Sequence, residues 1–160
     1  MGTTRSGLYL NTAGSRRTIS DYALVHSVEG TYMNVGSTDP KKPLRLKSGG
    51  HGQDMFKILK KAGIGYTIAK TYPNAVRIGN VENHYLKAKR LYNKQTWFPK
   101  NWTKYDILRA GLHVASLAKN KNKKDGQQMI GKWKGVIVVV IKRGGVPQTI
   151  APCFEWPNKK

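Results

Sequence analysis

The clearest pattern of apolar and polar positions lies in residues 104–118. Apolar or small side chains recur there at helical spacing, at Ile107, Leu108, Gly111, Val114, Ala115 and Ala118. Thr103 is a good N-cap residue, and the acidic Asp106 follows it three positions later. This pattern predicts an amphipathic helix with one buried face.

Two further segments have helical patterns. Residues 20–30 contain apolar side chains that predict a helix, with Ser20 or Asp21 as its cap. A second helix is predicted directly after His51, from the spacing of Met55, Phe56, Ile58, Leu59 and Ala62. The sequence AGIG at 62–65 ends it.

Strand patterns occur in two pairs. Residues 66–70 and 75–81 predict short strands separated by a turn. Residues 129–143 and 146–152 predict a hairpin whose two runs are joined by two glycines. Helices therefore come mostly first and an antiparallel sheet mostly last, so the predicted fold class is α+β.

Polar stretches set the expected boundaries. Residues 1–20 are rich in Gly, Ser, Thr and Arg and are expected to be a polar lead-in or an artificial junction. Residues 21–157 are expected to form a single domain. Loops are predicted at 36–50, which has two prolines and three glycines, and in the basic stretch 120–126.

Charge dominates the composition. The chain has 29 Lys and Arg against 8 Asp and Glu, a net charge of +21, and these residues are spread along its length. Such an excess favours a polyanion as partner, because neutralising phosphates releases counterions, although an acidic protein meets the same electrostatic need. No segment approaches the ~18 consecutive apolar residues of a membrane span, so no membrane partner is expected.

The chain offers few ligands for metals. Its eight acids are scattered, with none within four residues of another, whereas a two-metal nuclease needs clustered carboxylates. Cys153 is the single cysteine, which excludes an internal disulfide and a zinc site built on cysteines. We therefore expect neither a metal site nor a cofactor.

Four histidines remain as chemical groups: His26, His51, His84 and His113. Metal-free cleavage of RNA needs one group to accept the 2′-OH proton, another to protonate the leaving 5′-oxygen, and a cation. His51 stands out, because the glycines around it predict an uncrowded, presented ring, and the helix after it offers free N–H groups to an anion. His113 lies in the predicted helix 104–118 and is expected to be structural. A non-catalytic basic RNA-binding protein is the alternative.

Three blocks of the sequence then show a resemblance. The blocks are "GGHG" before a helix, "TWFPKNWTKYDILRAGLHVA" and "GVIVVVIKRGGVPQTIAP". The chain resembles the bacterial EndoU nuclease domain over residues 22–152, both in the order of these blocks and in their residues. The stretches "HSVEGT" at 26–31 and "SGGH" at 48–51 match the two histidine motifs of that family. The resemblance implies that His26 and His51 are the acid–base pair. His84 is the alternative partner of His51.

The resemblance also implies a catalytic lysine and a substrate-contacting threonine. Gln95 stands where the family has its lysine, so Lys94 beside it is the first candidate, and Lys89 and Lys87 are alternatives. Near the end of the chain, "QTIAP" keeps the family's threonine as Thr149. Ala151 replaces the aromatic residue of that motif, so base stacking is lost there or supplied by Phe154 or Trp156.

The implied fold, shared with barnase, RelE and colicin-type RNases, has helices packed on a twisted antiparallel sheet. The implied activity is metal-independent cleavage of single-stranded RNA, often a tRNA loop, by attack of the 2′-OH to leave a 2′,3′-cyclic phosphate. The resemblance further implies a toxin domain secreted as part of a larger carrier protein and acting in the cytoplasm of a target cell. An acidic cognate immunity protein is then expected as its partner.

Overall fold

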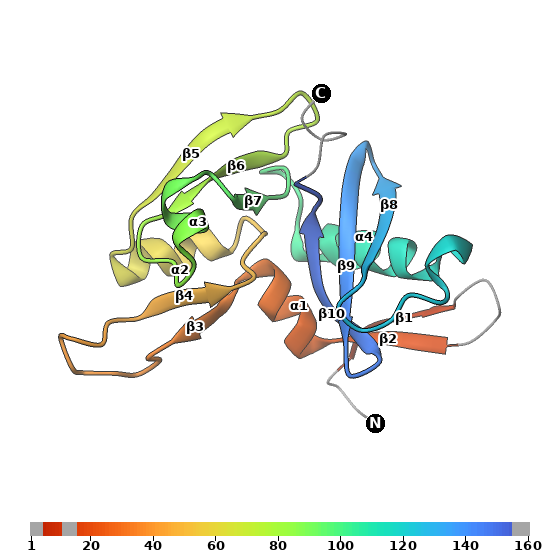
Figure 1. Cartoon of the computed structure of the whole chain (residues 1–160), viewed down its shortest axis with the longest axis horizontal. Coiled ribbons are helices and arrows are strands. Elements are labelled where there is room, and N and C mark those ends of the chain that lie inside the picture. Colours follow the sequence, from red (N-terminus) through yellow and green to blue (C-terminus); the bar gives the residue numbers. More distant parts are fainter. Residues whose placement is uncertain (1–4, 11–15, 155–160) are drawn as a thin grey trace.

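The computed structural model describes residues 5–10 and 16–154, in which helices are interspersed among the strands (Figure 1). In chain order the elements are β1 (Arg5–Leu10), β2 (Arg16–Ser20), α1 (Asp21–Val28), β3 (Thr31–Met33), β4 (Arg45–Ser48), α2 (Met55–Ala62), β5 (Tyr66–Thr71), β6 (Arg77–Val81), α3 (Lys87–Leu91), β7 (Gln95–Trp97), α4 (Lys104–Ser116), a 3-10 turn (Ala118–Asn120), β8 (Gln128–Trp133), β9 (Val136–Arg143) and β10 (Val146–Pro152).

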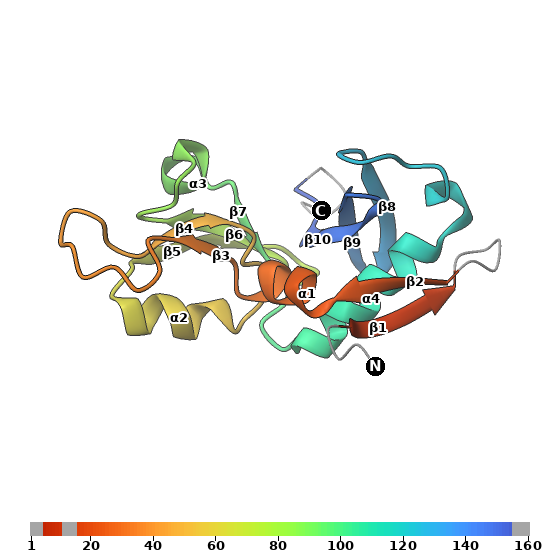
Figure 2. The same cartoon turned by 90° about the horizontal axis from the view of Figure 1, so that it is seen from below.

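These elements are arranged in two halves with α1 between them (Figures 1 and 2). One half holds the hairpin β3–β4, the antiparallel sheet β5-β6-β7, and the helices α2 and α3. The other half holds the antiparallel sheet β10-β9-β8, the hairpin β1–β2 and α4. In Figure 2, α4 covers one face of the sheet β10-β9-β8, and α2 and α3 lie on opposite sides of the other half.

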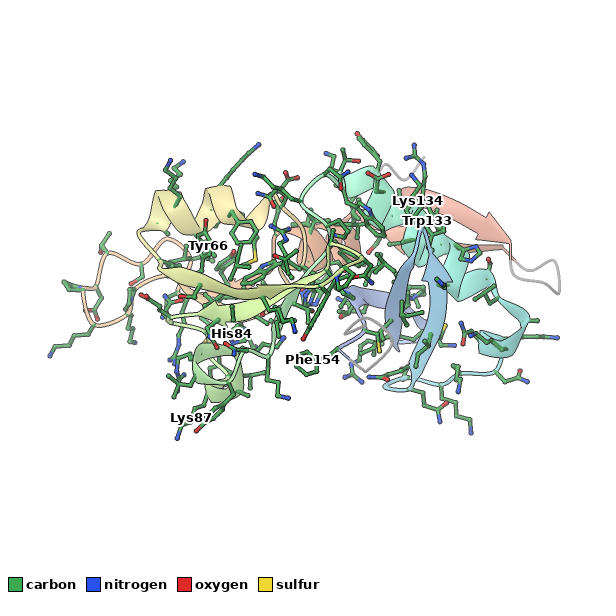
Figure 3. The ribbon with its side chains drawn as sticks, turned by 90° about the horizontal axis from the view of Figure 1, so that it is seen from above. Tyr66, His84, Lys87, Trp133, Lys134 and Phe154 are labelled. Atoms are coloured by element: carbon green, nitrogen blue, oxygen red, sulfur yellow. The ribbon has the colours of Figure 1, made fainter. Side chains whose placement is uncertain are left out.

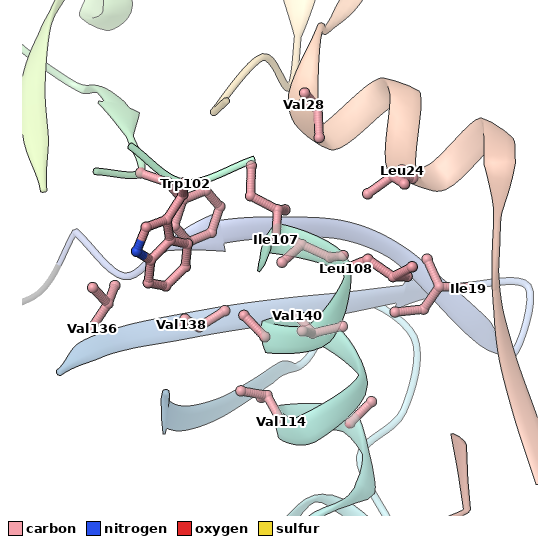
Figure 4. Packing of buried hydrophobic residues seen from close by; sticks show 14 of the residues in the cluster. Ile19, Leu24, Val28, Trp102, Ile107, Leu108, Val114, Val136, Val138 and Val140 are labelled. Carbon is pink, nitrogen blue, oxygen red and sulfur yellow. The ribbon is translucent and has the colours of Figure 1, made fainter. Parts of the chain in front are cut away.

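Each half has its own buried core. In the larger core, Leu24 and Val28 of α1 and Ile107 of α4 pack over the inward side chains of β9, such as Val138 (Figure 4). The smaller core contains Leu46, Met55, Phe56, Leu59, Ile64, Val81 and Trp97. Trp97 belongs to the smaller core, and its neighbour Phe98 belongs to the larger one. The end of β7 therefore passes between the two halves.

Three predicted helices are confirmed, and their ends follow the expected chemistry. The Ser20 side chain accepts from the N–H of Ala23 at the start of α1. Thr103 and Asp106 form the expected capping box at the start of α4. Gly63, with φ of 70°, ends α2 in the left-handed conformation that glycine adopts without strain.

The α+β class is also confirmed, but the order of its elements differs from the expectation. Helices are not confined to the N-terminal part, and the strands form several small antiparallel sheets in place of one. The run 129–143 is two strands, because Lys134 and Gly135 have positive φ values of 47° and 78° and turn the chain between β8 and β9. The expected loop 36–50 contains β4, which pairs with β3.

The N-terminal segment also has regular structure. Residues 5–10 and 16–20, expected to be a polar lead-in, pair as the hairpin β1–β2. Ile19 is fully buried in the larger core. Within the described part of the chain, no helix has the length and apolar character needed to cross a membrane.

Candidate active site at the junction of the two halves

The loop that carries His51 packs against the C-terminal end of α1. Carbonyl groups in the last turn of a helix have no partner within the helix. The N–H groups of Gly50, His51 and Gly52 donate to the carbonyl oxygens of His26, Ser27 and Val28, at 3.0, 2.6 and 3.0 Å respectively. The loop therefore caps α1, and this capping brings the His51 and His26 segments side by side.

Glycines around His51 permit this close approach. Gly49 has φ of +72°, and a Cβ added to it would overlap the carbonyl oxygen of His26 and lie 3.0 Å from the His26 ring.

The expectation that His51 is uncrowded and presented to solvent is wrong, since only 5% of His51 is exposed. The expected free N–H groups of the next helix are also occupied: those of Met55, Phe56 and Lys57 donate to the carbonyls of Gly52, Gln53 and Asp54.

Strand β7 and the residue after it hold His51 from the other side. Nδ1 of His51 lies 2.7 Å from the carbonyl oxygen of Thr96, and the N–H of Phe98 donates to the His51 carbonyl at 2.8 Å. Because a carbonyl only accepts, Nδ1 carries the proton and Nε2 carries the lone pair of the neutral ring. Burial, followed by the positive charge of Lys89, lowers the pKa of His51 to about 3. The ring is thus a neutral base with a fixed tautomer.

Gln95 supports the same loop from within β7. Its side-chain Nε2 donates to the carbonyls of Gly50 at 2.7 Å and Gly49 at 3.2 Å. The side chain is fully buried, and its Oε1 has no hydrogen-bond partner. At the place where the resemblance led us to look for a lysine, the chain therefore has a neutral group that holds the backbone of the His51 loop.

His26 contacts two threonine hydroxyls, one from Thr31 just after α1 and one from Thr149 on the distant strand β10. Its Nδ1 lies 2.7 Å from Oγ1 of Thr31, and its Nε2 lies 3.1 Å from Oγ1 of Thr149. Burial, followed by the charge of Lys89, lowers the pKa of His26. The hydroxyl of Ser27 accepts from the N–H of Ile150 at 2.9 Å, and so fastens β10 to α1 beside this contact.

Among the three lysine candidates, Lys89 lies within electrostatic reach of the histidines. It is half-buried on α3, and its charge lowers the pKa of His26, His51 and His84. Burial lowers the pKa of Lys89 itself. Lys94 is exposed, with Nζ 4.2 Å from the ring centroid of Phe154, and Lys87 is exposed at the outer side of α3 (Figure 3).

His84 lies in the turn that precedes α3 (Figure 3). Its ring is fully buried; Nδ1 accepts from the N–H of Leu86 at 2.9 Å, and Nε2 is buried without a hydrogen-bond partner. Arg90 of α3 donates to the His84 carbonyl at 2.8 Å. Burial, followed by the charges of Lys89 and Arg90, lowers the pKa of His84 to about 4. These contacts join His84 to the start of the helix that carries Lys89.

The remaining expectations concern stacking groups and His113. Phe154 is partly buried against the larger core and lies under Lys94, and Trp156 is outside the described residues. His113 is exposed on α4, away from the contacts just described. Across residues 5–10 and 16–154, no three or more His, Cys, Asp and Glu side chains gather where they could hold a metal ion.

Several contacting residues were not singled out as site residues in the sequence. Thr31 is the last residue of the "HSVEGT" stretch, which begins with His26. Its place in that motif could have identified it as a contact of His26. Thr96 contacts His51 through its carbonyl at 2.7 Å and through its hydroxyl at 3.2 Å, and Ser27 acts through a hydroxyl inside a helix. Neither side chain has a local sequence signal for these contacts.

Taken together, a neutral histidine with its lone pair on Nε2, a second histidine held by hydroxyl groups, and a half-buried lysine can transfer two protons and stabilise one negative charge. Residues 36–155 match the family model of the bacterial EndoU nuclease. The matched range contains His51, Lys89 and Thr149, and His26 lies shortly before it. No curated protein and no solved structure matches the chain. Since the family model covers most of the 160 residues, the chain belongs to the bacterial EndoU nuclease family.

Proposed function

We propose that this nuclease is a metal-independent endoribonuclease that cuts single-stranded RNA and leaves a 2′,3′-cyclic phosphate. The observation that carries the proposal is the pairing of His26 and His51 through the capped end of α1, with the charge of Lys89 acting on both rings. RNA carries its own nucleophile, so these three groups suffice for the chemistry.

In the proposed reaction, Nε2 of His51 takes the proton of the 2′-OH, and the 2′-oxygen forms a bond to the adjacent phosphorus. The bond from phosphorus to the 5′-oxygen breaks, and His26 gives its proton to that oxygen. Lys89 stabilises the additional negative charge on the phosphate oxygens. After the cut His51 holds one proton more and His26 one fewer, and the product is a cyclic phosphate.

The two rings are suited to different roles. Nδ1 of His51 is committed to the Thr96 carbonyl, so only Nε2 is available as a base, and the lowered pKa keeps it unprotonated at neutral pH. His26 has a hydroxyl at each nitrogen, and a hydroxyl accepts from a protonated ring as readily as it donates to a neutral one. A bound phosphate raises the pKa of His26 by its negative charge and so favours the acid form.

The other candidates receive supporting roles in this proposal. Thr149 and Thr31 orient His26, and His84 positions the helix that carries Lys89. Lys87 and Lys94, both exposed, contribute to the electrostatic attraction of RNA.

A synthetic oligoribonucleotide that the protein cuts, and the same oligonucleotide with one 2′-deoxyribose before the mapped cut, test the proposal in the presence of EDTA. We expect a cyclic phosphate from the first and no cut at that position in the second, since the nucleophile is missing. Cleavage of both, or loss of all cleavage with EDTA, would overturn the mechanism.

We further propose that the protein is a toxin domain of bacterial competition, carried by a larger secreted protein and acting on a tRNA loop in the cytoplasm of the target cell. The resemblance to toxin domains and the net charge of +21 support this proposal, and the charge suits an acidic immunity protein. Expression inside bacteria should stop growth, and co-expression of an acidic protein encoded beside it should restore growth. Unrelieved toxicity with such proteins would count against the immunity partner.

A further inference from the structure

A cavity of about 340 Å³ opens beside His26, between residues that belong to the two halves. Its walls come from α1, from the hairpin β3–β4, and from the hairpin β9–β10. The lining residues are Tyr22, His26, Thr31, Lys47, Ser48, Arg143, Gln148 and Thr149. Neither His51 nor Lys89 lines it, so the cavity adjoins the catalytic cluster on the side of His26.

The charged lining of this cavity is entirely basic. Lys47 lies exposed on β4, and Arg143 lies exposed at the end of β9, so the two cations come from different halves of the protein. None of the lining residues is acidic, and Ser48 and Gln148 add polar groups that bond to an anion or to a base. An anionic ligand with hydrogen-bonding groups fits such walls.

Tyr22 adds an aromatic surface. Tyr22 is 62% exposed on α1, so its ring is open to solvent. The Tyr22 ring lies nearly parallel to the His26 ring, with an angle of 13° between planes and 6.4 Å between centroids. An exposed aromatic ring beside cations is the arrangement with which proteins bind single-stranded nucleic acid, because bases stack on the ring and phosphates meet the cations.

The position beside His26 decides which nucleotide belongs here. We propose that this cavity binds the nucleotide on the leaving side of the cut, with its base stacked on Tyr22 and its 3′-phosphate between Lys47 and Arg143. The inference rests on the proposed function, in which His26 protonates the 5′-oxygen of that nucleotide. The nucleotide attached to the oxygen that His26 protonates must lie against His26, and the cavity is the space on that side.

The test uses an oligoribonucleotide spanning a mapped cut, in two forms: one with a normal base directly after the cut and one abasic there. We expect Tyr22→Ala to lower kcat/KM about tenfold or more on the normal form, the loss typical of one stacked base, and to leave the abasic form near wild type. Tyr22→Phe keeps the ring and should cut both forms like wild type. The same pattern is expected in the Kd of uncut versions that carry a 2′-deoxyribose before the cut.

A second pair of oligonucleotides tests the cations. One ends at the nucleoside after the cut, and the other continues with a 3′-phosphate. Lys47→Gln and Arg143→Gln should weaken binding of the longer form and leave the shorter form unchanged. Lys60→Gln, an exposed charge on α2, is the matched control and should affect neither form.

The outcomes separate this inference from the proposed function. Suppose that the wild type cuts RNA but Tyr22→Ala reduces cleavage of the normal and abasic forms equally. Tyr22 then acts only through His26, and the proposed binding of the leaving-side nucleotide in this cavity is overturned. No effect of Tyr22→Ala on either form overturns it as well. A wild-type protein that cuts no RNA would overturn the nuclease mechanism, and the leaving-side assignment with it.

Discussion

Nδ1 of His51 donates a 2.7 Å hydrogen bond to the carbonyl oxygen of Thr96. This contact, made inside the protein by a residue of β7, decides which nitrogen of His51 can act as a base. It also makes the histidine part of the structure, since the ring supplies a hydrogen-bond donor to the carbonyl of the buried Thr96. Chemistry and stability at position 51 can therefore be separated by substitution.

His51→Asn keeps an N–H donor near Nδ1 but has no base at Nε2. We expect its free energy of unfolding to stay within about 1 kcal/mol of wild type, whereas His51→Ala loses about 1–3 kcal/mol because the Thr96 carbonyl is left unpaired. Both variants should lose at least about a hundredfold in cleavage rate. Urea unfolding and single-turnover cleavage measure the two effects, and near-normal cleavage by His51→Asn would contradict the assigned base.

Gly49→Ala tests the packing of the His51 loop against α1. The control is Gly36→Ala, because Gly36 has a similar φ of +76° but open space around its Cβ position. Gly36→Ala should cost only the backbone strain of about 1–2 kcal/mol and leave cleavage unchanged. Gly49→Ala should cost more and should also reduce cleavage, since its Cβ would push the loop away from His26. Equal effects of the two substitutions on unfolding and cleavage would mean that the loop tolerates displacement.

The lowered pKa values predict acid sensitivity of the fold. Unfolded histidines bind protons below about pH 6.5, whereas His84 and His51 stay neutral in the folded protein down to about pH 4 and 3. The unfolded state therefore binds more protons in this range, and stability falls as the pH falls, by at most ~1.4 kcal/mol per pH unit for each histidine.

His84→Asn should weaken that pH dependence, because its side-chain oxygen can accept from the Leu86 N–H and does not titrate in this range. Tm measured from pH 7 to pH 4 should fall more steeply for wild type than for His84→Asn. His113→Asn, at an exposed position, serves as the control. Parallel curves for wild type and His84→Asn would contradict the account of His84.

Substitution of the three candidate lysines by alanine should lower the rate of cleavage by different amounts. Lys89→Ala should lower it about 10²–10³-fold, the effect of removing one group that stabilises transition-state charge. Lys87→Ala and Lys94→Ala should retain most of the rate at moderate salt, because their charges are exposed and screened. Single-turnover cleavage at saturating protein measures this difference, and a larger loss in Lys94→Ala would reassign the lysine.

Local signals in the sequence predicted the parts of the fold that local interactions determine. The capping box of Thr103 and Asp106 and the periodicity after it are contained within one helix, so α4 could be predicted with its start. The pairing of β3 with β4 was missed because both strands are short and only partly buried, so no alternation marks them. The turn at Lys134 and Gly135 was missed because residues 129–143 were interpreted as one continuous strand run.

The histidines, Thr149 and a set of candidate lysines could be named from the sequence, but the contacts that join them could not. His26 and His51 belong to motifs, but the contact of His26 with Thr149 joins positions 123 residues apart. Which lysine lies near the histidines depends on how α3 packs, and the glycines around His51 were misinterpreted because their packing partner, α1, is distant in the sequence. Spacing along the chain contains no direct information on such contacts.

The most direct test of the central claim is digestion of total bacterial RNA in EDTA by wild type, His26→Ala, His51→Ala, Lys89→Ala and the control His113→Ala. We predict discrete fragments ending in 2′,3′-cyclic phosphate from wild type and His113→Ala, and intact RNA with the other three variants, all of which should still bind RNA. Intact RNA with wild type, together with tight and salt-sensitive binding, would contradict the account and leave an RNA-binding protein.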